Sequence, residues 1–223
     1  MGWEFPGILR YLPSATLVPR DEIATTLAML PRDARICDIG AGGRRLTQTV
    51  VAVDAFPGQG VDLMGDIHKL PIADESFDAV FCTGTLEHVR DPRRAVAELQ
   101  RILRPGGMVH IDVPFIQGYH ADPTDYWRFT IDGLRVLCEN FEEIASGPYI
   151  GPSSALVWII RAWTNSWSSH RIVSNLLLVP VALVVTPFKY LDYLMIRLRR
   201  SHHVASAVFF RGRKPASRAR TSS

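Results

Sequence analysis

Glycines and acidic residues follow two neighbouring apolar runs, in a pattern that suits the binding of a nucleoside. The first run, Ile36–Ile39, contains Asp38 and continues directly into Gly40 and Gly42. Glycine lets the backbone approach a ligand closely because it has no Cβ. The second run ends at Asp54, and an acidic residue at the end of a strand can accept hydrogen bonds from ribose hydroxyls. This spacing predicts a nucleoside-containing cofactor, although glycines at this spacing also occur in ordinary turns.

A long polar and aromatic segment, residues 113–130, carries side chains that could act as a base or stack on a sugar. His120, Asp122 and Asp125 could each take a proton from a hydroxyl group, and His88 is a further candidate base. The alternative for both histidines is structural: a hydrogen bond that holds the loop, or a helix cap. A metal site at His120, Asp122 and Asp125 is conceivable, but we predict none, because short polar loops usually form local turns. The substrate-binding candidates are Tyr119, Tyr126, Trp127 and Arg128.

Short apolar segments alternate with helical ones along residues 34–150, which predicts a parallel sheet covered on both faces. In such sheets ligands bind beyond the carboxyl ends of the strands, where the candidate residues fall. The expected strands are 35–39, 50–54, 61–64, 77–82, 108–113, 141–145 and 205–211, and the expected helices are 19–29, 91 up to Pro105, and 131–139.

Six blocks, in this order, make the sequence resemble the class I S-adenosylmethionine-dependent methyltransferases of the type 11 kind. The resemblance implies an α/β fold: a Rossmann-like seven-stranded methyltransferase sheet, here with an apolar helical insertion before the last strand. It also implies S-adenosylmethionine as cofactor and EC class 2.1.1. The blocks are Asp38-Ile39-Gly40-Ala41-Gly42, Asp54, Gly65–Pro71, Ser76–Val80, Leu86-Glu87-His88-Val89 and Leu103–Gly107.

Carried over residue by residue, the resemblance implies a cofactor site at the carboxyl ends of the strands. Asp38, Gly40 and Gly42 would line the methionine end, and Asp54 would hold the ribose hydroxyls. The remaining cofactor residues would enclose the adenine side: Asp66 would face the amino group beside Ile67, and Thr83 and Leu86 would close the opposite side.

Two features depart from the family's pattern. Arg44 stands where the third glycine usually falls, so it either faces the cofactor carboxylate or is a solvated side chain. Only 16 positions separate Asp38 from Asp54, which leaves room for about one helical turn at residues 44–48.

The segment Tyr119–Thr130 resembles the acceptor loop of a bacterial methyltransferase subgroup, some of whose members sit among surface-glycan biosynthesis enzymes. The resemblance implies methyl transfer to a small-molecule, glycan or lipid-linked acceptor, with O-methylation favoured. The alternative is a catalytically degenerate methyltransferase fold that serves as a scaffold or binding protein at the membrane surface. We expect no nucleic-acid partner, because the acidic body has no basic groove.

Charge divides the chain into an acidic body and a basic C-terminal third. Residues 1–150 hold 14 basic and 21 acidic residues, a net charge of −7, whereas residues 151–223 hold 11 basic residues and one acidic residue, a net charge of +10. The run Ile172–Phe188 is apolar and interrupted by Pro180 and Pro187. Basic and aromatic flanks favour peripheral contact with a membrane surface; a cap or dimer interface and a true span are the alternatives.

These observations divide the chain into five parts and suggest a compartment. We expect an N-terminal helical segment (1–33), a methyltransferase core (34–150), an apolar insertion (151–203), the last core strand (204–212) and a basic disordered tail (213–223). The start of the chain lacks the pattern of a signal peptide, and the three cysteines read as buried thiols. We therefore expect a cytoplasmic protein, peripheral on the inner face of the membrane if the insertion binds lipid.

Overall fold

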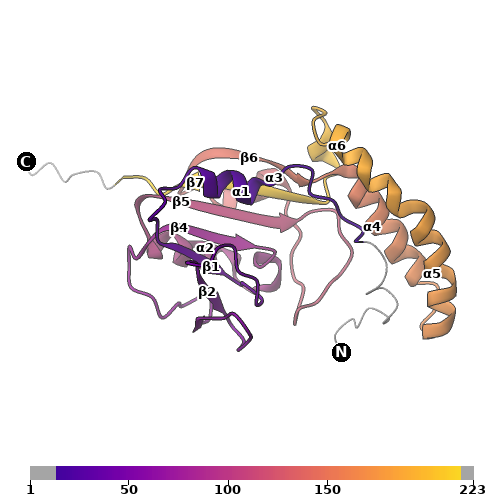
Figure 1. Ribbon diagram of the computed structural model, residues 1–223, viewed down its shortest axis with the longest axis horizontal. Helices are drawn as coiled ribbons and strands as arrows, with labels where there is room; N and C mark the ends of the chain where they lie inside the picture. The colour runs from indigo at the N-terminus through magenta and orange to yellow at the C-terminus, as the bar shows by residue number, and fades with distance from the viewer. Residues whose placement is uncertain (1–13, 217–223) are drawn as a thin grey trace, which may run out of the picture.

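A mixed sheet forms the centre of the molecule. The computed structural model describes residues 14–216, and within them seven strands pair in the order β3-β2-β1-β4-β5-β7-β6 (Figure 1). Strands β1 to β5 are parallel, and β7 is antiparallel to both β5 and β6, which confirms the predicted fold class. The strands are β1 (Ile36–Ile39), β2 (Val51–Asp54), β3 (Leu63–Met64), β4 (Phe77–Thr83), β5 (Leu103–Pro114), β6 (Glu142–Ile150) and β7 (Ala207–Arg213).

Helices cover the sheet because each presents one apolar stripe. Helix α2 (Pro92–Ile102) begins at the cap residue Asp91, which accepts a hydrogen bond from the Arg94 amide. Its buried stripe joins α3 (Ile131–Leu137) on the large core. Helix α1 (Glu22–Ala28) supports a smaller cluster around Phe81.

A buried polar network fastens α1 to the sheet. Arg211 on β7 donates to Glu22 at 2.7 Å and to the Thr26 hydroxyl at 2.7 Å, and Thr26 also lies 2.9 Å from His110 Nδ1 on β5. By its place in the sequence, Glu22 is only an acidic residue in the first turn of a helix. Its buried partner lies 189 positions away, which no local pattern indicates.

The connection between β1 and β2 contains no helix, so the predicted turn at residues 44–48 is wrong. The arginines of this loop pair with acidic groups and do not form part of a helix. Arg45 donates to the Val50 carbonyl and pairs with Asp62, while Arg44 reaches Asp38. Side-chain bonds therefore hold this loop where a crossover helix would otherwise lie.

Two expected boundaries also move. Strand β5 already begins at Leu103, with a register shift against β4, so the stretch that ends α2 is part of the strand. Strand β7 ends at Arg213, and Lys214 still exchanges backbone hydrogen bonds with Gly106 and Gly107. The pairing therefore continues past the predicted start of the tail, whose remaining part, 217–223, lies outside the described residues.

The apolar insertion forms a helical hairpin between β6 and β7, as predicted. Figure 1 shows α4 and α5 side by side, projecting from the end of the sheet. Asp192 fixes the base of the hairpin, because its buried carboxylate accepts from the amides of Ser153 and Ser154 at 2.8 Å. The elements are α4 (Pro152–Asn165), α5 (Arg171–Val185), η3 (Thr186–Leu191), α6 (Asp192–Met195) and η4 (Ser201–His203).

Candidate functional site

A glycine turn joins the carboxyl ends of β1 and β2. Gly40 adopts φ +73°, and its amide donates to the Val53 carbonyl at 2.8 Å. A Cβ at Gly40 would lie 2.2 Å from Thr85 Oγ1, so no side chain fits there. The Gly42 amide donates to the Asp54 carboxylate at 2.9 Å. The structure therefore brings Gly40, Gly42 and Asp54 together, as the sequence predicts.

Asp38 is buried beneath this turn with one oxygen unpaired. Its Oδ1 has no hydrogen-bond partner within residues 14–216, and its Oδ2 lies 3.3 Å from the Arg44 guanidinium. Burial raises the pKa of Asp38 to about 6; the Arg44 charge opposes this, and the Asp112 and Asp54 charges add to it. A buried carboxylate oxygen without a donor is costly, so this atom is an open position for a cationic or N–H group of a ligand.

Arg44 is neither a purely solvated side chain nor remote from the site. Its guanidinium also hydrogen-bonds the Thr83 hydroxyl, and about half of the side chain is exposed. It therefore connects the carboxyl ends of β1 and β4, across the predicted methionine end of the cofactor site.

The residues predicted to enclose the adenine differ in their exposure. Asp66 is exposed and accepts from the His68 amide at 2.9 Å; this bond and His68's ring lower the pKa of Asp66. Ile67 is buried nearby in the large core. Leu86 has no exposed surface and packs in the same core, so in this conformation it is a structural residue.

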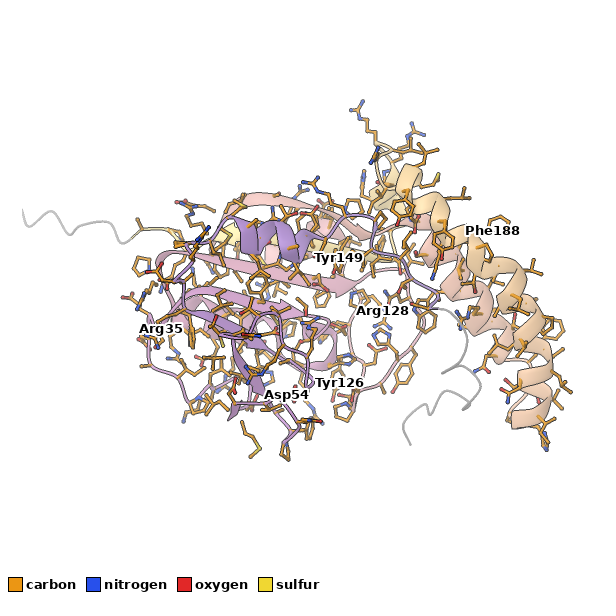
Figure 2. The ribbon with its side chains drawn as sticks, in the orientation of Figure 1. Arg35, Asp54, Tyr126, Arg128, Tyr149 and Phe188 are labelled. Carbon is orange, nitrogen blue, oxygen red and sulfur yellow. The ribbon has the colours of Figure 1, made fainter. Side chains whose placement is uncertain are left out.

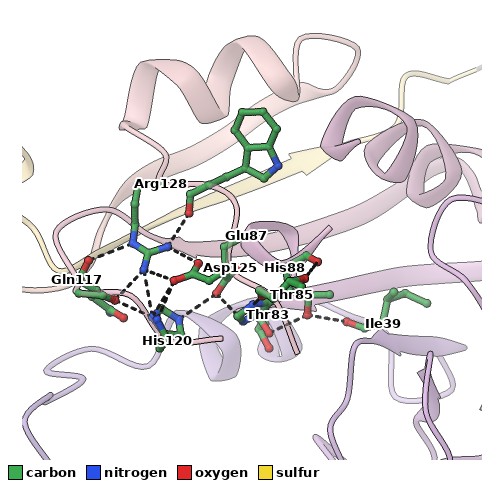
Figure 3. A network of polar contacts seen from close by, with 12 residues as sticks. Ile39, Thr83, Thr85, Glu87, His88, Gln117, His120, Asp125 and Arg128 are labelled. Atoms are coloured by element: carbon green, nitrogen blue, oxygen red, sulfur yellow. Dashed lines mark hydrogen bonds and ion pairs between the residues drawn. The ribbon is translucent and has the colours of Figure 1, made fainter. Parts of the chain in front are cut away.

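Arg128, predicted to bind substrate, holds the acceptor loop together in the structure (Figure 3). Its guanidinium grips both oxygens of Asp125, at 2.5 and 2.7 Å, and donates to the carbonyls of Gln117, Gly118 and Trp127. All of its donor nitrogens therefore have protein partners, and they fix the path of the loop.

Asp125 is likewise not available as a base. Burial alone would raise the pKa of Asp125, but its bonds from Arg128 and from the His120 amide hold that pKa below its ordinary value. Asp122 is exposed, so the considered set His120, Asp122 and Asp125 is divided between the surface and an ion pair.

Three side chains converge instead on the space between η2 (Leu86–His88) and the acceptor loop. Glu87 Oε1 lies 3.7 Å from His88 Nε2 and 3.8 Å from His120 Nε2, and the two imidazoles meet edge to face. The interaction with Glu87 raises the pKa of His120 above its usual value. His88 and His120, both predicted as catalytic, are thus brought together, and Figure 3 shows them joined through Glu87.

Exposed aromatic rings line the outside of the same loop. Tyr119, Tyr126 and Trp127 are exposed, and the Trp127 indole N–H donates to the Val89 carbonyl at 2.8 Å. His120 packs near Trp158 of α4, with ring centroids 6.3 Å apart. Figure 2 shows Tyr126 and Arg128 between Asp54 on the sheet and Phe188 on the hairpin.

A separate hollow of about 510 Å³ opens near the amino ends of β4 and β5. Two of its charged side chains already pair with each other, since Arg104 bonds Asp78 at 2.7 Å, and the Arg35 amide also donates to Asp78. Because it lies at the edge of the sheet opposite the glycine turn, we assign it no part in the site.

Sequence reasoning missed the role of Glu87. Glu87 stands in a block that carries the family resemblance, and no local pattern in the sequence indicates that its side chain is buried. The hydrogen bonds and ion pairs of Arg44 and Arg128 depend on which loops lie close together in space, and no local sequence pattern predicts them.

Comparisons with known proteins cover mainly the cofactor half. A family model described as a methyltransferase domain matches residues 38–111. A demethylmenaquinone methyltransferase from Renibacterium salmoninarum is 47% identical over 106 residues, which cover 46% of this chain and 41% of that protein. The chain spans from 20% to 41% of the length of the curated relatives compared with it.

Solved structures match over most of the described fold. The Burkholderia thailandensis 1,6-didemethyltoxoflavin-N1-methyltransferase, with bound S-adenosylhomocysteine, has a TM-score of 0.55 at 19% identity, covering 90% of this chain and 79% of that one. The [4+2]-cyclase SpnF has a TM-score of 0.55 at 18% identity, covering 88% and 81%. At these identities the likeness establishes the class I methyltransferase fold, and the matched domain ends before the acceptor loop.

Proposed function

We propose that this chain, which has the class I methyltransferase fold and a methyltransferase domain over residues 38–111, transfers a methyl group from S-adenosylmethionine to an acceptor oxygen. The observation that carries the proposal is the open Asp38 oxygen beneath a glycine turn bordered by Asp54. A small-molecule, glycan or lipid-linked acceptor fits the loop of exposed aromatic rings that faces this turn.

The residues present fit the cofactor. The ammonium group of its methionine end could donate to the unpaired Oδ1 of Asp38, which satisfies an otherwise unpaired buried acceptor. Gly40 allows no side chain over the turn, so the backbone is free to contact a ligand. Asp54, half-buried at the end of β2, could accept from ribose hydroxyls while it holds the Gly42 amide.

The acceptor half supplies positioning and a proton acceptor. When bound, S-adenosylmethionine supplies a sulfonium methyl group, whose carbon bonds to the acceptor oxygen while the carbon–sulfur electron pair leaves on sulfur. Arg128 and Asp125 hold the loop that carries His120 in one arrangement. The Nε2 atoms of His120 and His88 face Glu87 and could take the proton of an acceptor hydroxyl.

Calorimetric titration with S-adenosylhomocysteine tests the cofactor site. We expect binding to the full chain, and at least tenfold weaker binding to the Asp54→Asn variant, since a hydrogen bond to a charged group contributes about 1.5–3 kcal/mol. Asp132→Asn is the matched control, because Asp132 is an exposed carboxylate on α3. A folded chain that binds no cofactor, or equal affinity in both variants, would contradict the proposal.

A methyl-transfer assay separates this proposal from a scaffold role. Labelled S-adenosylmethionine is incubated with the full chain and with polar, glycan and lipid fractions of a cell extract. Incorporation that depends on Asp54 supports methyl transfer. Cofactor binding with no incorporation into any fraction would favour the alternative, a binding protein with a methyltransferase fold.

We also propose that the helical hairpin contacts a membrane surface. The segment Ile172–Met195 is long and apolar enough to cross a membrane by length and composition, with mean hydropathy 1.8 and only 28% of its most apolar window buried. The large exposed apolar side chains of the hairpin are Leu156, Ile159, Trp163, Ile172, Val173, Leu176, Leu183, Val184 and Phe188. Such a continuous apolar surface is unusual on a protein that faces only water.

The geometry supports a surface position over a span. Helix α4 has 14 residues, about 21 Å, which is short of the roughly 30 Å hydrocarbon core. Both ends of the insertion return to one sheet edge, where Ile150 pairs with Ala207. Exposed Arg197, Arg199 and Arg200 follow the hairpin and would meet anionic headgroups. A membrane-bound acceptor would then arrive next to the loop that carries His120, whose ring lies near Trp158 of α4.

Vesicle flotation tests this contact. We expect the full chain to float with vesicles that contain anionic lipid and to float less with neutral vesicles or at high salt. Leu176→Asp combined with Leu183→Asp should abolish flotation, whereas Val136→Asp, at an equally exposed apolar position on α3, should not. Equal flotation of both variants would refute the membrane contact.

A further inference from the structure

We propose that Glu87, His88 and His120 form a binding site for a divalent transition-metal cation, with zinc as the best chemical match. Their three ligand atoms all lie within 4.8 Å of one another. The site's position beside the methyl acceptor rests on the proposed function, whereas metal binding itself does not. This donor set differs from the loop residues His120, Asp122 and Asp125, because Glu87 and His88 take the place of the two aspartates.

Hydrogen bonds orient both imidazoles for this purpose. His88 Nδ1 bonds the Thr124 carbonyl, and His120 Nδ1 lies 3.0 Å from the Gly118 carbonyl, nearer than the Arg128 guanidinium at 3.2 Å. A carbonyl only accepts, so we assign each ring proton to Nδ1. Each Nε2 then carries a lone pair, and a backbone carbonyl on the other ring nitrogen is the usual arrangement around metal-bound histidine.

Glu87 brings a charge that the structure leaves uncompensated. Its side chain is only 2% exposed, and Oε2 has no hydrogen-bond partner among the described residues. Its Oε1 faces two nitrogens at 3.7 and 3.8 Å, beyond hydrogen-bond distance. Arg128, which lies 3.2 Å from His120 Nδ1, is paired with Asp125. A buried carboxylate that faces two lone pairs needs a cation between them.

The three ligand atoms, which lie within 4.8 Å of one another, would have to move closer together to hold a small transition-metal ion. Zinc lies about 2.0–2.1 Å from histidine nitrogen and 2.0–2.2 Å from carboxylate oxygen, which puts neighbouring ligands of a tetrahedral site roughly 3.3 Å apart. Two imidazoles with one carboxylate favour zinc or a similar ion over magnesium and calcium, which prefer oxygen ligands. The histidines are partly exposed, at 14% and 25%, which leaves a coordination position open on their side.

An open position would explain how this site acts on a weakly acidic hydroxyl. The acceptor oxygen would take the fourth position, and its O–H bond would break with the proton passing to water while the electron pair remains on oxygen. That oxygen would then be the nucleophile for the methyl carbon. The competing arrangement has a proton in place of the metal, as an imidazolium at His120 paired with Glu87, so direct metal binding distinguishes the two.

Equilibrium dialysis of the untagged full chain, first stripped with EDTA, tests the site. We expect one equivalent of Zn²⁺ or Co²⁺ and no binding of Mg²⁺ at the same concentration, with Co²⁺ giving the visible absorption of a four- or five-coordinate site. Glu87→Gln and His120→Gln should each weaken binding at least 100-fold, since even supporting residues around a metal contribute 10–100-fold. Zinc should also raise the melting temperature of the wild type and not that of either variant.

His202→Ala is the matched control, because His202 is an exposed histidine beside His203 outside this cluster. It should leave the one equivalent unchanged. Unaltered stoichiometry and affinity in both cluster variants, or loss of the bound metal only in the control, would overturn the proposal. If Glu87→Gln does not fold, His120→Gln decides alone. Titration with S-adenosylhomocysteine in EDTA reports the cofactor site separately, so failure of one proposal is distinguishable from failure of the other.

Discussion

The two halves of the site are built in different ways. The cofactor half consists of backbone turns at the carboxyl ends of β1 and β2, with a loop in place of a crossover helix and Asp38 left with an open oxygen. The acceptor half is held by side chains, above all by five hydrogen bonds that the Arg128 guanidinium donates to Asp125 and to backbone carbonyls. One half leaves polar atoms for a ligand to satisfy, and the other is internally satisfied except around Glu87.

The difference indicates where affinity and specificity arise. A ligand group that donates to the unpaired oxygen of Asp38 forms a hydrogen bond that the free protein lacks. This half therefore favours binding of a cationic cofactor. A rigid loop with partly exposed histidines and aromatic rings positions an acceptor instead of adapting to it. Variants that disturb the cofactor half should therefore leave the acceptor half largely intact, and the reverse should also hold.

The largest effect is expected for Arg128→Leu. It leaves the buried Asp125 carboxylate without its partner, and such losses cost about 3–5 kcal/mol of unfolding free energy. Urea denaturation measures this cost. Cofactor affinity, measured where the variant is folded, should change less than threefold. A parallel loss of cofactor affinity would show that the halves are not independent.

Arg135→Leu provides the comparison for that substitution. Arg135 also pairs with an aspartate three positions away, Asp132, and in addition with Glu143 on β6, but both of these pairs are exposed. Exposed pairs contribute about 0–1 kcal/mol, so this variant should stay within that range. Equal costs at Arg128 and Arg135 would contradict the view that the acceptor loop depends on a buried ion pair.

A smaller, pH-dependent effect is expected at Asp38. Its pKa is about 6 in the folded chain and about 3.9 in an unfolded one, so between these values the native state binds more protons. Stability therefore falls as pH rises from 4 to 7, by about 3 kcal/mol at most. Asp38→Asn removes this dependence. The stability of the variant relative to the wild type should increase over the same range in urea titrations.

Cofactor binding should respond in the opposite direction. The ionised Asp38 is the form that pairs with an ammonium group, so wild-type affinity for S-adenosylhomocysteine should decline below pH 6. The charged groups that act on Asp38 are Arg44, Asp54 and Asp112. Arg44→Gln removes the opposing cation, so the inflection in stability should move to higher pH. An unchanged inflection would mean that Arg44 does not act on Asp38.

The sequence predicted the strands, their order along the chain and the glycine turn after β1, because each of these depends on a local pattern. Apolar runs, Asp91 before Pro92, and glycines after β1 each carry their information within a few residues. It could not predict that Arg128 binds its own loop, since an exposed aromatic segment with an arginine equally suits a substrate. The absence of a helix at 44–48 depends on Asp62, which lies in a different loop.

The smallest expected effect is the difference in stability between alanine variants at the two glycines of the turn after β1. Gly40 and Gly42 both adopt positive φ, +73° and +57°, so alanine at either costs about 1–2 kcal/mol. Only Gly40 also lacks space, because its Cβ would overlap Thr85, whereas nothing lies within 4 Å of a Cβ at Gly42. Gly40→Ala should therefore be more destabilising than Gly42→Ala by about 1 kcal/mol, as measured by urea denaturation. Adding Thr85→Gly should recover that difference in the Gly40 variant alone. Equal losses of stability at both glycines would mean that backbone conformation, and not contact with Thr85, determines the shape of this glycine turn.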